Sequence, residues 1–199
     1  MIIINCKQNS DQWIQEKLGK PSASNASKII TNSGKKSQQQ DGYLYELAAE
    51  TITREREDGP KDKNMIMGKE REDESRNLYE LIKNVRVKQV GVVYKDKHKK
   101  FLCSPDGIIK KKYGLELKNV LPKTQVKYLI NKKLPSEYFG QIQFSLYVTG
   151  FKSWEFFSYC PGLKHFVIRV KRDERFIKAL KGKLEIFCKD LEKIIRKIK

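Results

Sequence analysis

The sequence lacks the residue patterns that indicate a structural zinc site. It contains only two histidines, and its four cysteines form no Cys-x-x-Cys pair and are widely spaced, at Cys6, Cys103, Cys160 and Cys188. Tetrahedral zinc sites usually combine closely spaced thiolate and imidazole ligands, so this spacing argues against structural zinc. We expect the cysteines to be reduced and to fill small spaces in the core.

The sequence also lacks an apolar run long enough to span a bilayer, which requires about 20 consecutive residues in a helix. The apolar run at residues 1–4 is short, has no basic start and is soon followed by polar residues. A secretory signal peptide instead carries a basic segment before a longer apolar one. We therefore expect no membrane segment and a cytoplasmic location.

Acidic residues are few relative to basic ones. The 199 residues include 24 Asp and Glu against 42 Lys and Arg, which gives a formal net charge of +18. Such a charge attracts polyanions, of which nucleic acid is the commonest. The length and the 39% hydrophobic content predict one domain, residues 1–199, with a sizeable core. The composition favours a nucleic-acid partner.

Helical and strand periodicities alternate along the chain and predict an α/β fold. Helix caps and apolar residues at helical spacing predict helices at 10–18, 22–30, 43–52, 65–83, 122–130, 135–148 and 177–198. Alternating and β-branched residues predict strands at 2–6, 85–94, 154–159 and 166–170, with a strand, hairpin and strand series continuing to residue 120. The polar residues 31–42 are expected to form a mobile loop.

Residues 104–118 combine a turn with an alternating strand. Ser-Pro-Asp-Gly at 104–107 is a favourable turn sequence, and Glu116 and Lys118 project to one side of the following strand. If the strands pair, Asp106 comes near Glu116, and two adjacent carboxylates repel unless a cation lies between them. Oxygen ligands of this kind suit a hard cation such as magnesium. Taken alone, however, the pattern favours an ordinary turn and edge strand.

An ordered series of short motifs extends over nearly the whole chain. It comprises Ser10-Asp11-Gln12-Trp13, Leu18-Gly19, Ser22-Ala23-Ser24, Gly68-Lys69-Glu70-Arg71-Glu72, Cys103-Ser104-Pro105-Asp106-Gly107, Gly114-Leu115-Glu116-Leu117-Lys118, Gln141-Ile142-Gln143, Tyr147-Val148-Thr149 and Arg172-Asp173-Glu174. In this series the chain resembles the bacteriophage lambda exonuclease family, the YqaJ-like viral recombinases, within the PD-(D/E)xK nucleases. The resemblance implies a restriction-endonuclease-like core, in which helices flank a central mixed β-sheet, and a long C-terminal helix.

The resemblance also implies a set of catalytic residues. Asp106, Glu116 and the main-chain carbonyl of Leu117 are expected to bind catalytic Mg²⁺, for which Mn²⁺ would substitute. Glu72 is expected to complete a second metal position, and Lys118 to orient or activate the attacking water. This set fits hydrolysis of a phosphodiester by two metal ions.

By the same resemblance, a pocket for the terminal 5′-phosphate of DNA is expected from Lys17, Ser24, Ser104 and Gln141. At Lys17 the family's member from phage lambda has arginine, and lysine supplies charge without a bidentate fork. Strict dependence on a 5′-phosphate is therefore not implied for this chain. Lys35 and Lys36 lie in a loop that matches a DNA-contacting region.

The implied function is a Mg²⁺-dependent 5′-to-3′ exonuclease that acts on double-stranded DNA ends. It would leave 3′ single-stranded tails for phage-type recombination with a single-strand annealing protein, in a bacterial host cytoplasm. The family forms rings of three subunits, which implies a homotrimer. Two alternatives stay open: an endonuclease of the same superfamily, restriction or resolvase-like, and, less favoured, a basic DNA-binding module whose acids are structural.

Overall fold

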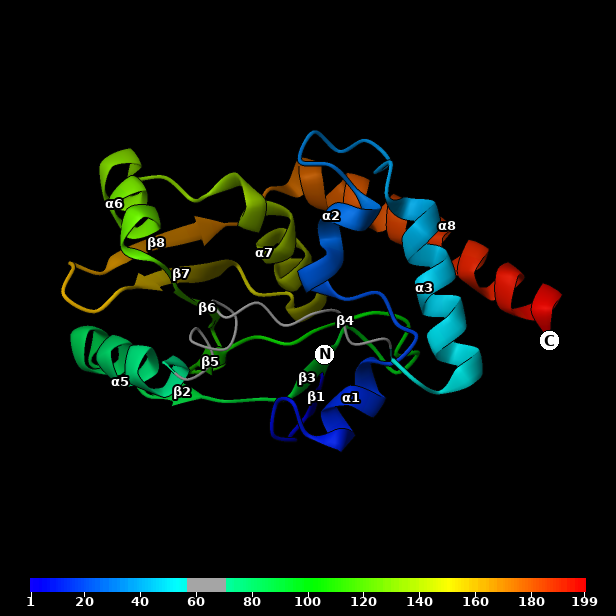
Figure 1. The fold of residues 1–199 in the computed structure, drawn as a ribbon, viewed down its shortest axis with the longest axis horizontal. Helices are drawn as coiled ribbons and strands as arrows, with labels where there is room; N and C mark the ends of the chain where they lie inside the picture. Colours follow the sequence, from blue (N-terminus) through cyan, green and yellow to red (C-terminus); the bar gives the residue numbers. More distant parts are fainter. Residues whose placement is uncertain (57–70) are drawn as a thin grey trace.

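Two β-sheets organise the part of the chain that the structure, a computed structural model, describes: residues 1–56 and 71–199 (Figure 1). The larger sheet has the order β2 (Val87–Lys88), β5 (Gly107–Ile109), β6 (Tyr113–Asn119), β7 (Ser153–Tyr159) and β8 (Phe166–Lys171). Strands β6 and β7 run parallel, and the other pairs are antiparallel. The smaller, antiparallel sheet has the order β1 (Ile2–Ile4), β3 (Val92–Tyr94) and β4 (Leu102–Cys103).

Helices cover both faces of the larger sheet. The helices of the described residues are α1 (Asp11–Lys17), the 3-10 helix η1 (Ala23–Asn25), α2 (Ala26–Ile29), α3 (Gln40–Thr53), α5 (Glu72–Lys83), α6 (Pro122–Asn131), α7 (Ser136–Thr149) and α8 (Glu174–Ile198). Helix α5 lies on one side of the sheet and α6 and α7 on the other, while the long α8 runs beside α3 (Figure 1). The expected mixed α/β fold with a long C-terminal helix is confirmed. None of the helices in the described ranges is long and apolar enough to cross a membrane.

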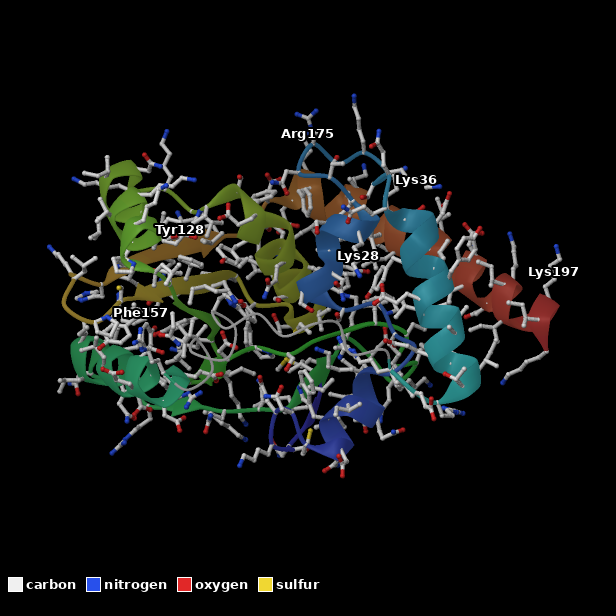
Figure 2. All side chains as sticks on the ribbon, in the orientation of Figure 1. Lys28, Lys36, Tyr128, Phe157, Arg175 and Lys197 are labelled. Atoms are coloured by element: carbon white, nitrogen blue, oxygen red, sulfur yellow. The ribbon has the colours of Figure 1, made fainter. Side chains whose placement is uncertain are left out.

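The two faces of β6 are packed differently. Leu115 and Leu117 form a buried cluster with Tyr79 of α5 and with Phe157, which Figure 2 shows between α5 and the sheet. The opposite face of the sheet packs through Phe156 into the main core, beneath α6 and α7. The alternation of β6 therefore leaves its charged side chains on the side of α7, as the sequence predicts.

The final helix follows its predicted apolar stripe for most of its length. The buried residues of α8 repeat at spacings of three and four: Phe176, Ile177, Leu180, Leu184, Phe187, Cys188 and Leu191. Asp173 caps the helix, because its side chain accepts a hydrogen bond from the Phe176 N–H at 2.9 Å. At the far end Ile198 is exposed, so the stripe ends before the helix does.

The prediction of one strand over residues 85–94 is wrong. The segment divides into β2, which pairs with β5, and β3, which pairs with β1 and β4 in the other sheet. Gly91 lies between them, where a Cβ atom would come within 2.2 Å of the Cys6 Sγ. The close approach of two backbones, which requires glycine here, therefore separates the strands.

The start of one helix also differs from its prediction. Residues 40–42, which were expected in a polar loop, form the first turn of α3, where Gln40 is buried and its side chain donates to the Ile29 carbonyl at 3.3 Å. Of the helix expected over 65–83, the structure shows α5 from Glu72, and residues 65–70 lie outside the described residues.

Candidate active site

The predicted hairpin brings Asp106 beside the end of β6. Gly107 pairs with Leu115 in the antiparallel ladder, so Asp106, one residue earlier, lies next to Glu116, one residue later. The Asp106 Oδ2 accepts a hydrogen bond from the Leu117 N–H at 2.6 Å. Glu116 is only 3% exposed, and its Oε1 lies 2.6 Å from the Lys118 Nζ. Two carboxylates and one ammonium therefore converge, as the alternating pattern predicts.

With both carboxyl groups ionised, the Asp106–Glu116 pair would carry more negative charge than the Lys118 ammonium balances. Burial raises the pKa of Asp106, and the charges of Glu116 and, less strongly, Glu72 raise it further, against the opposing effect of Lys118. Burial alone would lower the pKa of Lys118, but the two carboxylates outweigh it and the pKa is raised. Lys118 is therefore held as a cation, and the pair still favours additional positive charge.

The donor set fits a hard divalent cation. Within a strand the N–H and C=O of one residue face the same side. Because the Leu117 N–H points to Asp106, its carbonyl oxygen faces that edge too, beyond the end of β5. Two carboxylates and one main-chain oxygen suit Mg²⁺ or Mn²⁺, which take few protein ligands. Within residues 1–56 and 71–199, no group of three or more Asp, Glu, His or Cys side chains is arranged to hold a metal.

Glu72 is the first residue of α5 and lies near the Asp106–Glu116 pair. It does not form a close cluster of three carboxylates with that pair. Its charge reaches Asp106, whose pKa it helps to raise. Its Oε1 lies 2.5 Å from the Arg76 Nη2, one helical turn later. The sequence prediction did not include Arg76, although the spacing of four residues after Glu72 indicates an ion pair on one helix face.

Two of the expected phosphate-pocket residues meet at Trp13. The Trp13 indole N–H donates to the Ser104 Oγ at 2.9 Å, and the Lys17 Nζ lies 3.9 Å from the centre of the indole ring. The Ser104 hydroxyl in turn donates to the Gly91 carbonyl at 2.6 Å. Trp13 had no role in the predicted pocket, but its position four residues before Lys17 could have shown that the two share a helix face.

The other two pocket residues lie on packed helices. Gln141 of α7 donates from Nε2 to the Glu116 Oε1 at 2.7 Å, so it reaches the carboxylate pair directly. Ser24 of η1 shares a hydrogen bond of 3.1 Å with Ser22, and η1 packs against α7. Gln141 thus links the carboxylate pair to α7, and η1, which carries Ser24, packs against the same helix.

Residues 12–152 match the family model of the YqaJ-like viral recombinase domain. The chain belongs to the YqaJ-like viral recombinase family. The fold of this YqaJ-like chain is similar to an alkaline exonuclease from Laribacter hongkongensis, with 25% identity and a TM-score of 0.86 over 95% of this chain and 96% of that one. A structure of that enzyme in complex with dAMP gives the same values.

A phage related exonuclease from Haemophilus somnus 129PT shares the fold, with 13% identity and a TM-score of 0.69 over 90% of this chain and 96% of that one. A search of curated proteins found no match. The family and the alkaline exonuclease together identify the YqaJ-like chain as a nuclease.

Lys17 of this YqaJ-like chain is an unusually weak base. Burial and the nearby Arg56 lower the pKa of Lys17 to about 8, although the Glu50 carboxylate opposes them. A lysine held among cations and partly out of water gains stability from an anion, so the position suits a phosphate group.

Lys35 and Lys36 are exposed on the loop between α2 and α3, at the upper edge of the molecule in Figure 2, where Lys36 is labelled. The Lys36 Nζ lies 3.0 Å from the Asp41 carboxylate. The structure therefore places these two lysines on the surface of the YqaJ-like domain, apart from the residues around Trp13.

Proposed function

We propose that this chain is a Mg²⁺-dependent exonuclease that degrades one strand of duplex DNA in the 5′-to-3′ direction. The observation that carries the proposal is the Asp106–Glu116 pair, two carboxyl groups that converge with the single ammonium of Lys118. The fold of an alkaline exonuclease surrounds the pair. A carboxylate pair without a bound cation would only repel the DNA backbone, so a binding module gains nothing from it.

The residues divide the chemistry among them. Asp106, Glu116 and the Leu117 carbonyl would hold one cation, and Glu72 would complete a second position. When bound, the divalent cations lower the pKa of a water and stabilise the leaving oxygen. Lys118, held charged by its two carboxylates, would orient the attacking water.

End recognition is assigned to the pocket near Trp13. Lys17 would supply charge to a terminal 5′-phosphate, while Ser24, Ser104 and Gln141 would supply hydrogen bonds. The support is that Ser104 and Lys17 both contact the Trp13 ring, and that Gln141 bonds Glu116. An end held there lies close to the catalytic pair, so cleavage would start from the 5′ terminus.

The charge of the chain suits a DNA-threading assembly. A closed ring of three subunits would turn the +18 charge of each chain into a positively lined channel. Lys35 and Lys36 would contact the DNA backbone. The 3′ single-stranded tails would be passed to a phage-type single-strand annealing protein.

Digestion of linear duplexes tests this proposal. One strand carries either a 5′-phosphate or a 5′-hydroxyl and a label at one end, and each duplex is incubated with Mg²⁺ or with EDTA. We expect Mg²⁺-dependent release of the 5′ label before the 3′ label, faster from the phosphorylated end. Rapid cutting of closed circular DNA would instead support the endonuclease alternative.

A second arm tests whether the carboxylates act in catalysis at all. Asp106→Ala and Lys118→Ala should each abolish most Mg²⁺-dependent nucleotide release while the chain still binds DNA. If neither substitution changes release, the assignment of this site as the catalytic centre is wrong.

A further inference from the structure

Arg76 carries a guanidinium group that is enclosed by polar partners next to the catalytic pair. Its side chain is only 8% exposed, which is rare for arginine unless it is paired. Its Nη2 lies 2.5 Å from the Glu72 Oε1 and its Nη1 lies 2.5 Å from the Asp73 Oδ1. With the Gln89 amide oxygen turned towards the group, that oxygen accepts from Nη1 and Nη2 at 2.9 Å. The side chain is thus fixed by three residues.

Stability alone does not account for this arrangement. Removing a guanidinium from water costs free energy that an ion pair repays only with good geometry. Asp73 is 87% exposed, and a pair with so exposed a partner contributes little. The Arg76 Nε is also buried without an acceptor among the described residues. The ion pair with Glu72 therefore has a purpose other than stability, which we seek in the position of the Glu72 carboxylate.

Glu72 needs a fixed cation if its carboxylate is to stay near the pair. The carboxylates of Glu72 and Asp106 carry like charges and repel each other at close range. A free glutamate side chain would turn away from this repulsion and keep its rotamer freedom. An arginine one turn later opposes both effects, because its planar fork fixes the direction of the hydrogen bond.

Arg76 is also connected to the catalytic turn from the other side. Gln89 precedes Val90, and the Gln8 side chain donates to the carbonyls of Val90 and Pro105 at 3.1 Å and 2.9 Å. Pro105 directly precedes Asp106. The guanidinium therefore joins the first turn of α5 to the segment that holds the turn before Asp106.

We propose that Arg76 is a positioning residue, which holds the Glu72 carboxylate towards the Asp106–Glu116 pair so that a second divalent cation can bind. This inference rests on the proposed function, in which Glu72 completes the second metal position. Partners of metal ligands typically change metal affinity by about 10–100-fold, which sets the expected size of the effect.

Binding of Mn²⁺ to the full chain, without DNA, tests the inference by a readout other than activity. Electron paramagnetic resonance counts free Mn²⁺ for the wild type, Arg76→Met, Arg76→Lys, Glu72→Gln and the double variant Glu72→Gln/Arg76→Met. Arg86→Gln is the matched control, because Arg86 is 96% exposed and pairs with Glu80 near the other end of α5. Thermal unfolding of each variant separates folding from binding.

We expect the wild type and Arg86→Gln to bind two ions. Arg76→Met and Glu72→Gln should still bind the tighter Mn²⁺ ion, but their affinity for the second ion should fall by tenfold or more. The double variant should lose no more than Glu72→Gln alone, because Arg76 acts through Glu72. Arg76→Lys should fall between the wild type and Arg76→Met, since an ammonium reaches the carboxylate without a fork.

Unchanged binding of both ions by a folded Arg76→Met would overturn the inference, and so would a double variant much weaker than Glu72→Gln. If Arg76→Met does not fold, the comparison of Arg76→Lys with Arg76→Lys/Glu72→Gln decides in the same way. Failure of the proposed function gives a different result, because Asp106→Asn would then leave binding of both ions unchanged.

Discussion

Two buried glutamates on neighbouring strands of the same sheet have opposite surroundings. Glu116 on β6 faces α7 beside Asp106, and Glu155 on β7 faces α5. Glu155 is 2% exposed, as buried as Glu116, but Tyr79 donates to it at 2.8 Å and Arg169 at 3.0 and 2.6 Å. Glu155 thus has two cations, Arg169 and Lys83, and the Tyr79 hydroxyl, whereas Glu116 has the Lys118 ammonium and the Gln141 amide and lies beside a second acid.

The pKa directions follow from this difference. Burial raises the pKa of Glu155, but the hydrogen bonds from Tyr79 and Arg169 outweigh it, and the pKa is lowered overall. Burial and the adjacent Glu116 raise the pKa of Asp106 instead. Burial of an acid therefore does not by itself indicate a functional site, because Glu155 is as buried as Glu116 but is paired with Arg169 and Tyr79.

Asp106→Asn should have the largest effect on activity. The amide oxygen can still accept from the Leu117 N–H, but the ligand charge is lost, so Mg²⁺-dependent nucleotide release should fall by roughly 10³-fold. Without divalent cations the variant should melt at a higher temperature than the wild type, because a repulsion is removed. Release within tenfold of the wild type at saturating Mg²⁺ would break the contrast with Glu155.

Glu155→Gln should mainly affect stability. It removes the charged partner of Arg169 and Tyr79, and hydrogen bonds to charged groups contribute about 1.5–3 kcal/mol, so the free energy of unfolding should fall by about 2 kcal/mol. Urea denaturation measures the change, with the exposed Glu185→Gln as control. At a temperature where the variant is folded, its nuclease activity should match the wild type. A loss of activity without a loss of stability would make Glu155 part of the site.

The two acids should also give opposite pH dependence of stability in EDTA. The folded-state pKa of Asp106 is raised, so the folded chain binds the extra proton, and stability falls as pH rises above about 4. The pKa of Glu155 is lowered, so its contribution is present above about pH 4.3 and is lost as pH falls below it. Thermal melts from about pH 3 to 8 should show that Asp106→Asn flattens the alkaline decline and Glu155→Gln the acid one. A change of the same limb by both variants would contradict the assigned directions.

Lys17 is a basic group whose pKa is also shifted by its surroundings. Because its pKa is lowered to about 8, the preference in kcat/KM for a 5′-phosphate over a 5′-hydroxyl end should decline by roughly tenfold per pH unit above that value. Lys17→Arg should remove the decline, since arginine stays charged. Lys28→Arg, at a partly exposed lysine paired with Glu46, should leave the decline in place. If the phosphate preference of Lys17→Arg declined with pH as it does in the wild type, Lys17 would not be the phosphate-binding group.

The smallest effect is expected at the hairpin tip, the end of β5 and β6 farthest from the pair. Lys110 and Lys111 have φ of 49° and 55°, a left-handed backbone that disfavours residues with a Cβ. Lys111→Gly should raise the free energy of unfolding by about 1 kcal/mol without changing activity. Lys112 does not have a positive φ, so Lys112→Gly should not raise the free energy of unfolding. Thermal denaturation of the two variants measures the difference. Equal effects would show that the tip is not strained.

The sequence predicts the hairpin that carries Asp106 and Glu116 well because the relevant signals are local. The turn residues at 104–107 fix where β5 begins, and the period of two in β6 fixes the faces of Glu116 and Lys118. The stripe of α8 is predicted for the same reason. These elements need no knowledge of distant partners.

The remaining features depend on contacts between distant residues. The division of residues 85–94 into two sheets follows from the approach of Gly91 to Cys6, and a run of β-branched residues does not show which strand will be its neighbour. Trp13 and Ser104 are 91 residues apart, and only the fold brings them together. Arg76 was visible as a charged residue on α5, but its burial was not.

Calorimetric titration of Mg²⁺ into the chain without DNA tests the central claim most directly. Three proteins are compared: the wild type, Asp106→Asn and Glu155→Gln. If the unbalanced Asp106–Glu116 pair is the cation site, the wild type and Glu155→Gln will bind Mg²⁺ with the same affinity, and Asp106→Asn will show no binding at the same site. Equal Mg²⁺ binding by the wild type and Asp106→Asn would contradict the account.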